Sequence, residues 1–234
     1  MKALFGFPGA GEGPNAFRHW KEHLKEEICF QPVLYNRAGA GAYCRNMAEA
    51  AERSVREILP SAQQGAELYL FGHSMGAVVA YETASLLERE YSIHLRALFV
   101  SAFTSPDVPI EEGIADLGDE ALAAEICSHG NVPEEFLRRP ALLKLFLPKI
   151  RADYRLIEEY RDSLHHVLDC PIIGFFGQQD ELVTPETSEG WADYTTGSFF
   201  RCYFPGNHYY YYDHPEEITE EIRRWIRKFS LEQG

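Results

Sequence analysis

Residues 68–81, LYLFGHSMGAVVAY, contain the pattern that decides the fold. The first part is a run of apolar and aromatic residues typical of a buried strand, and the helical stretch at 75–90 follows at once. Between them, Gly72-His73-Ser74-Met75-Gly76 matches G-x-S-x-G, a weak signal alone and a strong one between a strand and a helix. The pattern predicts a sharp turn that exposes the Ser74 hydroxyl, with glycines at positions where neighbouring backbone comes close.

Strand-like and helix-like segments alternate on both sides of this turn. Apolar runs predict strands at 3–7, 29–35, 67–72, 95–103, 171–177 and 199–204. Helical spacing predicts helices at 16–27, 47–59, 75–90, 119–130, 139–164 and 215–229. This alternation indicates one α/β domain spanning residues 1–234, with a mainly parallel sheet and flanking helices. Together with the serine turn, it favours the α/β-hydrolase fold.

One interval is too long for an ordinary strand-to-strand connection. Between Phe103 and Pro171 lie 67 residues with no convincing strand, whereas a crossover needs only about a dozen. We expect residues 108–165 to form an inserted helical lid over a site at the strand ends. The alternative is a set of crossover helices that simply cover the sheet.

A serine nucleophile needs donors for the oxyanion, a base and an acid. The backbone N–H of Met75, at the start of the helix, can supply one donor. The loop in FGFPGAGEG (5–13) can supply a second from Gly9 or Ala10. Read alone, this glycine-rich loop suggests phosphate binding, but it lacks the GK[ST] of a P-loop and the spacing of G-x-G-x-x-G.

The acid and the base should follow Ser74 in the order acid, then histidine. Asp180, in the turn after the strand at 171–177, is the favoured acid, and Asp107 is the reserve. His208 lies in the turn PGNH after the last strand and is the favoured base. His214 sits at a helix start, where Asp213 and Glu216 form a capping pattern. A metal site built from the two histidines is not expected, because no third ligand is nearby.

Composition narrows the function classes further. The formal net charge of −14 argues against binding to nucleic acid or to anionic membranes. No apolar run reaches the length of a membrane span, and the first residues lack a signal-peptide pattern, so we expect a cytoplasmic protein. The five cysteines are scattered and form no CxxC pair, which argues against disulfides or a zinc ribbon. We expect a monomer with no cofactor and no metal.

Taken in order, five stretches resemble the type II (external) thioesterases that accompany nonribosomal peptide and polyketide synthases. They are LFGFPGAGEGPNAFRHW (4–20), YLFGHSMGAVVAYETASLLE (69–88), GNVPEEFLRRPALLKLFLPKIRADYRLIEEY (130–160), FGQQDELVTPETSEGW (176–191) and PGNHYYYYDHPEEI (205–218). The resemblance spans nearly the whole chain. It implies a serine thioesterase that removes stalled or misprimed acyl groups from the phosphopantetheine arm of carrier domains. It also implies Ser74, Asp180 and His208 as the triad.

Two features bear on the substrate and the partner. Such proteins often carry a Pro-Gly-Arg-Gly-like stretch after the second strand, whereas LYNRAGAGAYC (34–44) lacks the proline and keeps Arg37 and Gly39. Residues 138–161 carry a net charge of +4, against −14 for the whole chain. We therefore expect a carrier-docking patch; the alternative is a solvated helix face. The docking candidates are Arg138, Arg139 and Lys144.

Rival functions are a general carboxylesterase or lipase-like hydrolase, and a non-catalytic scaffold that binds carriers. Tyr209 and Tyr210 either pack in the core or shape an acyl or pantetheine channel.

Overall fold

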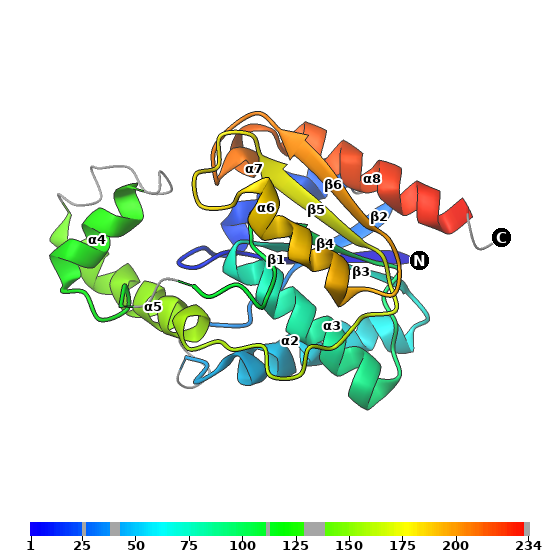
Figure 1. Ribbon diagram of the computed structural model, residues 1–234, viewed down its shortest axis with the longest axis horizontal. Coiled ribbons are helices and arrows are strands. Elements are labelled where there is room, and N and C mark those ends of the chain that lie inside the picture. The colour runs from blue at the N-terminus through cyan, green and yellow to red at the C-terminus, as the bar shows by residue number, and fades with distance from the viewer. Residues whose placement is uncertain (25–26, 38–42, 111–112, 129–138, 232–234) are drawn as a thin grey trace.

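The computed structural model describes residues 1–24, 27–37, 43–110, 113–128 and 139–231 (Figure 1). Through them runs a six-stranded parallel sheet of order β2-β1-β3-β4-β5-β6. The strands are β1 (Lys2–Phe7), β2 (Ile28–Pro32), β3 (Glu67–His73), β4 (Ala97–Ser101), β5 (Ile172–Gly177) and β6 (Phe199–Phe204). Every residue of β4 and β5 is buried, as expected for strands covered on both faces. The predicted α/β fold is confirmed.

The helices lie in the intervals between strands and, for the last two, after β6. They are η1 (Pro14–Phe17), α1 (Trp20–Leu24), α2 (Met47–Gln63), α3 (Met75–Tyr91), α4 (Asp119–Ser128), α5 (Pro140–Glu158), α6 (Pro185–Ser188), η3 (Glu189–Tyr194), α7 (Tyr210–Asp213) and α8 (Pro215–Leu231). None of those the structure describes is long and apolar enough to cross a membrane.

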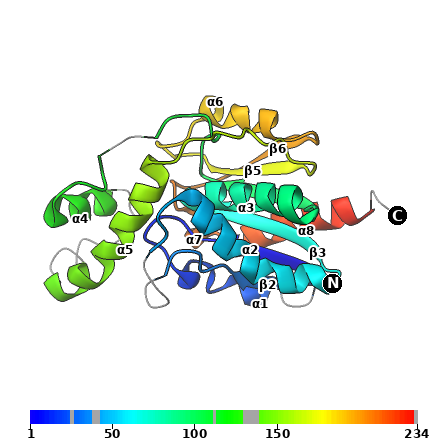
Figure 2. The ribbon, with the colours of Figure 1, turned by 90° about the horizontal axis from the view of Figure 1, so that it is seen from below.

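Two hydrophobic cores cover the two faces of the sheet. On one face α2 and α3 pack side by side, as Figure 2 shows, with the Trp191 and Tyr194 rings of η3 beside them. On the other face α1 and α8 pack together. The buried apolar residues of α8 recur at helical spacing, so the charged residues of the helix face outward. The buried apolar residues are Ile218, Ile222, Trp225, Ile226 and Phe229. The sheet is thus a rigid platform whose carboxyl edge can carry a site.

Several predicted elements differ from the observed ones. The helix predicted at 139–164 ends at Glu158, and the helix predicted at 47–59 continues to Gln63. The helix expected at 16–27 is wrong as one element: a 3₁₀ turn begins at Pro14, and of the residues in this range that the structure describes only Trp20–Leu24 are α-helical. Phe17 and Trp20 pack edge-on against each other and against the sheet, and this burial overrides the helical pattern. The strands at 29–35 and 95–103 are shorter than predicted. After Ser101, Ala102 adopts a φ of +50° and turns the chain out of the sheet.

The interval 108–165 contains α4 and α5, which lie together at one end of the molecule in both views (Figures 1 and 2). They share a small core of their own, formed by Leu122, Ala123, Ile126, Leu147 and Ile150. Residues 129 and 130 of the predicted helix at 119–130 lie outside the described residues. Whether this segment works as a lid stays a prediction.

Candidate active site

Ser74 occupies a tight turn between β3 and α3. Its φ of +51° lies in the left-handed region that residues with a side chain rarely adopt. The turn is held by the Ser74 N–H, which donates to the Ser101 carbonyl at 2.8 Å. A side chain at Gly76 would lie 2.2 Å from the Phe7 carbonyl oxygen, so only glycine allows α3 to approach β1 this closely. The local sequence thus produces the strained serine turn that the motif predicts, with Ser74 half-buried.

Asp180 and His208 form a hydrogen-bonded pair. Asp180 lies in the turn after β5, where its Oδ1 accepts the N–H groups of Leu182 at 2.9 Å and Val183 at 3.3 Å. The other oxygen, Oδ2, lies 2.9 Å from His208 Nδ1. Because a carboxylate only accepts, Nδ1 carries the proton and Nε2 is left as an acceptor. The Asp180 carboxyl is fully buried and the His208 ring is 9% exposed, so water competes little with this bond.

One cavity of about 330 Å³ brings together the predicted nucleophile, the predicted base and the predicted oxyanion donors. Its lining includes Ser74, Met75, His208, Gly9 and Ala10, the last two from the loop after β1. Thr104, Tyr154, Thr187 and Tyr209 also line it. The remaining side chains of the lining are apolar, namely Ala102, Phe103, Val108, Pro109, Ile110, Ile114, Ile157, Leu182 and Val183. A second hollow of about 380 Å³, lined by Pro8, Glu12 and Gly13 of the same loop, contains neither Ser74 nor His208. The smaller cavity is therefore the candidate site, and an apolar chain fits its lining.

The reserve residues lie elsewhere. Asp107 is exposed, and the carboxylate that bonds His208 is Asp180. His214 directly precedes α8, and its carbonyl accepts the Ile218 N–H at 3.1 Å. Since α8 begins at Pro215, the residue at the helix start is His214, and the predicted cap by Asp213 is wrong.

Sequence reasoning missed Glu12, in the loop after β1. The Glu12 side chain is buried and accepts three hydrogen bonds: from the Gly9 N–H at 2.6 Å, the Tyr211 hydroxyl at 2.8 Å and the Tyr212 hydroxyl at 2.7 Å. Burial raises the pKa of this carboxyl above its ordinary value, and the three donors oppose that rise. The run of four tyrosines was the available signal, but nothing in the sequence pairs it with a glutamate 200 residues away.

A second buried carboxylate holds the same loop. Asp153, on α5, is fully buried and accepts the Gly11 N–H at 2.8 Å and the Asn36 amide at 2.5 Å, and it pairs with Lys149. Burial raises the pKa of Asp153, and the Lys149 ammonium opposes that rise. Helix α5 is thereby fastened to the loop that lines the site.

His73 lies beneath the site as a neutral ring. Burial, followed by the electrostatic effect of the nearby His208, lowers the pKa of His73 well below its ordinary value. Its Nδ1 lies 3.0 Å from the Ser101 hydroxyl, which lies 2.7 Å from the Tyr210 hydroxyl. The ring packs 4.2 Å from that of Tyr211. These contacts make Tyr210 and Tyr211 core residues, whereas Tyr209 lines the cavity.

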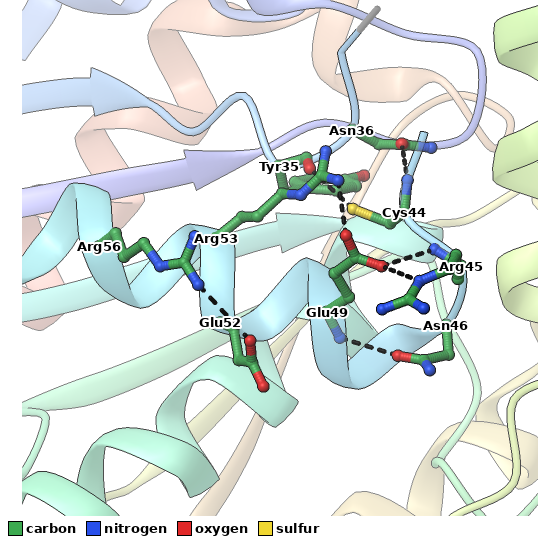
Figure 3. Close-up of polar contacts among 9 residues, drawn as sticks. All are labelled: Tyr35, Asn36, Cys44, Arg45, Asn46, Glu49, Glu52, Arg53 and Arg56. Carbon is green, nitrogen blue, oxygen red and sulfur yellow. Dashed lines mark hydrogen bonds and ion pairs between the residues drawn. The ribbon is translucent and has the colours of Figure 1, made fainter. Parts of the chain in front are cut away.

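The segment after β2 is partly described. The Cys44 N–H donates to the Asn36 side chain at 2.8 Å, and Glu49 on α2 holds Arg45 and Arg53 (Figure 3). Gly39 of the atypical stretch lies outside the described residues.

Most positively charged side chains of the segment 138–161 contact groups of the protein itself. Lys149, Arg151, Arg155 and Arg161 bind carboxylates or carbonyl oxygens. Of the docking candidates, Arg138 lies outside the described residues, while Arg139 and Lys144 are exposed at the start of α5. The remaining basic patch is therefore smaller than the sequence suggests.

Groups able to ligate a metal also lie away from Ser74. Glu88, His94 and Asp169 offer atoms within 4.8 Å of one another. His94 and Asp169 precede β4 and β5, so they lie at the opposite ends of the strands from Ser74, which follows β3.

Comparison with known proteins agrees with this geometry. The thioesterase domain family model matches residues 2–226. The gramicidin S biosynthesis protein GrsT of Aneurinibacillus migulanus is 31% identical, covering 96% of this chain and 88% of that protein. Two solved structures are also similar. RedJ, a thioesterase from the prodiginine pathway of Streptomyces coelicolor, has 33% identity and a TM-score of 0.86, covering 95% of this chain and 85% of that one. BorB, a type II thioesterase from the borrelidin biosynthetic cluster, has 30% identity and a TM-score of 0.83, covering 97% and 93%.

The strand–serine–helix turn, the buried Asp–His pair and these matches along nearly the whole chain lead to the same conclusion: the protein belongs to the thioesterase family.

Proposed function

We propose that this protein is a serine thioesterase that hydrolyses acyl or peptidyl thioesters on the phosphopantetheine arm of carrier proteins, clearing misprimed carrier domains of a nonribosomal peptide or polyketide synthase. The observation that carries the proposal is the Asp180–His208 hydrogen bond beside the cavity that His208 shares with Ser74. The relatives support the substrate class, because BorB is a type II thioesterase and GrsT serves gramicidin S biosynthesis.

The proposed reaction uses the groups that line the cavity. His208 Nε2 takes the proton of the Ser74 hydroxyl as its oxygen attacks the thioester carbonyl. The negative charge that develops on the carbonyl oxygen is held by the Met75 N–H and by an N–H of Gly9 or Ala10. His208 then protonates the departing pantetheine sulfur, leaving an acyl ester on Ser74. Asp180 keeps the Nδ1–H tautomer throughout.

Deacylation repeats these roles with water. His208 takes a proton from water as its oxygen attacks the acyl ester, and then returns the proton to the Ser74 oxygen. No step needs a metal or a cofactor.

The acyl group fits the apolar part of the cavity. Ile114, Tyr154 and Ile157 belong to residues 108–165, so this segment contributes one wall of the site. We propose that it acts as the lid over the acyl chain, with the Asp153 contact to Gly11 anchoring α5 beside the site loop.

The carrier docks, in this proposal, at the start of α5. Arg139 and Lys144 are exposed there, next to Leu145, which is 67% exposed. Carrier domains are commonly acidic, so these cations give the complementary charge on an otherwise acidic protein. Arg139→Glu together with Lys144→Glu should raise KM for a carrier-bound thioester more than for a small thioester. Equal effects on both substrates would remove the docking assignment.

Two assays separate this function from its rivals. Comparison of an acyl-carrier thioester with a p-nitrophenyl ester of the same acyl chain tests the esterase reading, which predicts that the oxygen ester is preferred. Labelling of Ser74 by a fluorophosphonate tests the scaffold reading, which predicts an unreactive serine. We also propose that the enzyme acts in the cytoplasm as a monomer, which sedimentation analysis would check.

A further inference from the structure

The loop after β1 has most of its N–H groups already bonded. The Gly9 N–H donates to Glu12 Oε2 at 2.6 Å, and the Gly11 N–H donates to Asp153 Oδ2 at 2.8 Å. The Glu12 N–H donates to the Gly9 carbonyl at 3.1 Å. Among the described residues the Ala10 N–H has no acceptor, and Ala10 lines the cavity with Ser74. Ala10 is thus the residue between Gly9 and Glu12 whose N–H remains available for a substrate oxygen.

The Gly9 backbone lies against the nucleophile. A Cβ built on Gly9 would sit 3.3 Å from Ser74 Cβ and 2.9 Å from Glu12 Oε2. Any movement of the Glu12 carboxyl therefore changes the position of the peptide that borders Ser74. An oxyanion donor contributes most when it is held in place before the charge develops, so the rigidity of this contact bears on the rate.

Glu12 also connects the loop to the segment of the proposed base. The Oε1 atom accepts both tyrosine hydroxyls, and Tyr211 and Tyr212 follow His208 by three and four residues. Tyr211 and Tyr212 stack on each other at 4.5 Å between ring centroids, and Tyr211 packs on the His73 ring at 4.2 Å. One buried carboxyl therefore ties together the two chain segments that must meet at the reacting carbonyl.

We propose that Glu12 is a positioning residue: it occupies the Gly9 N–H, leaves Ala10 with Met75 as the oxyanion donors, and fixes their loop to the segment that carries His208. The inference rests on the proposed function, because it concerns the oxyanion of that reaction. With this role for Glu12, the second oxyanion donor beside Met75 is the Ala10 N–H and not the Gly9 N–H.

The test uses a transition-state analogue of the substrate. A trifluoromethyl ketone of the acyl chain, in which the CF₃ group takes the place of the pantetheine sulfur, forms a hemiketal with Ser74 and places an oxyanion in the hole; the methyl ketone of the same chain does not. In ¹H–¹⁵N spectra of the whole enzyme, the Ala10 and Met75 amide protons should move downfield with the trifluoromethyl ketone, and the Gly9 proton should stay in place. A downfield shift of Gly9 in place of Ala10 would overturn the assignment.

Variants then test the role of Glu12. In Glu12→Gln the NH₂ faces either the Gly9 N–H, which also donates, or the two tyrosine hydroxyls, which can accept from it but lose the acceptor of their own protons. The variant should therefore weaken binding of the trifluoromethyl ketone about tenfold and lower kcat by a similar factor, with KM and methyl ketone affinity within about twofold. Tyr211→Phe and Tyr212→Phe, which keep ring packing, should each give part of this loss. If Glu12→Gln does not fold, the two tyrosine variants still test the positioning role of Glu12.

Glu82→Gln is the matched control. Glu82 on α3 is also a carboxyl with a pKa raised by burial and accepts the Tyr160 hydroxyl at 2.8 Å, away from the site loop. If Glu12→Gln and both tyrosine variants match this control in kcat and in ketone affinity, the positioning role is refuted. If the wild-type enzyme itself neither hydrolyses the thioester nor binds the trifluoromethyl ketone, the proposed function fails instead.

Discussion

The Asp180→Asn substitution tests the proposed role of Asp180 in orienting His208 while keeping the contacts that hold the turn. Asp180 Oδ1 accepts two backbone N–H groups while Oδ2 meets His208. An Asn side chain has one acceptor oxygen and one NH₂ donor. Turning its oxygen toward His208 would leave the N–H of buried Val183 facing a donor, at a cost of about 1–3 kcal/mol. The amide therefore keeps its oxygen on the turn and presents its NH₂ to the ring.

The consequence for His208 follows from its tautomer. Nδ1 must now accept, so the ring proton moves to Nε2, and Nε2 can no longer take the Ser74 proton. In serine hydrolases the wrong tautomer lowers kcat by about 10⁴, which corresponds to about 5.5 kcal/mol of activation free energy. KM should change little, because Asp180 does not line the cavity.

The assay compares kcat for an acyl-pantetheine thioester in the wild type, Asp180→Asn and Asp107→Asn, with melting temperatures measured in parallel. Asp107 is an exposed loop carboxylate with no bond to His208, so its variant should keep wild-type rates. A kcat for Asp180→Asn within tenfold of the wild type, or a large loss in Asp107→Asn, would refute the reasoning.

Two further predictions concern packing and pH. Gly76→Ala would place a Cβ 2.2 Å from the Phe7 carbonyl oxygen, so it should destabilise the fold by about 1–3 kcal/mol or more. In urea unfolding, Gly118→Ala, with open space around its Cβ, is the control, and equal stability of the two variants would contradict the close packing of α3 on β1 at Gly76. Burial raises the pKa of Glu82 above 4.5 in the folded state, so the folded protein holds a proton that the unfolded chain releases. Its contribution to stability is complete below pH 4.5 and is lost as the pH rises through the folded-state value. The stability of Glu82→Gln relative to the wild type should therefore increase with pH over this window, and a pH-independent difference would contradict the assignment.

The parts of the site predicted from the sequence are those that local patterns determine. The turn at Ser74 depends on adjacent residues, since glycines and a strand–helix boundary are enough to specify it. Asp180 and His208 each follow a recognisable strand, and parallel strands place their carboxyl ends at one edge. Those two positions could therefore be proposed before their hydrogen bond was seen.

The parts that were missed depend on contacts between distant segments. Glu12 meets Tyr211 and Tyr212 about 200 residues away, and Asp153 meets Gly11 across 142 residues. A carboxylate in a glycine-rich loop or on an amphipathic helix reads as a solvated group, because local spacing carries no information about burial. The same limit applies to 16–27, where contacts of Phe17 and Trp20 with the sheet break a pattern that predicts one helix.

The central claim is that the acyl group passes through Ser74. The most direct measurement is mass spectrometry of the enzyme, quenched during turnover of an acyl-phosphopantetheinyl carrier protein, followed by peptide mapping. The account predicts an acyl adduct on the peptide that contains Ser74, and neither adduct nor hydrolysis in a folded Ser74→Ala variant. Undiminished hydrolysis by Ser74→Ala, or an adduct on a different residue, would contradict it.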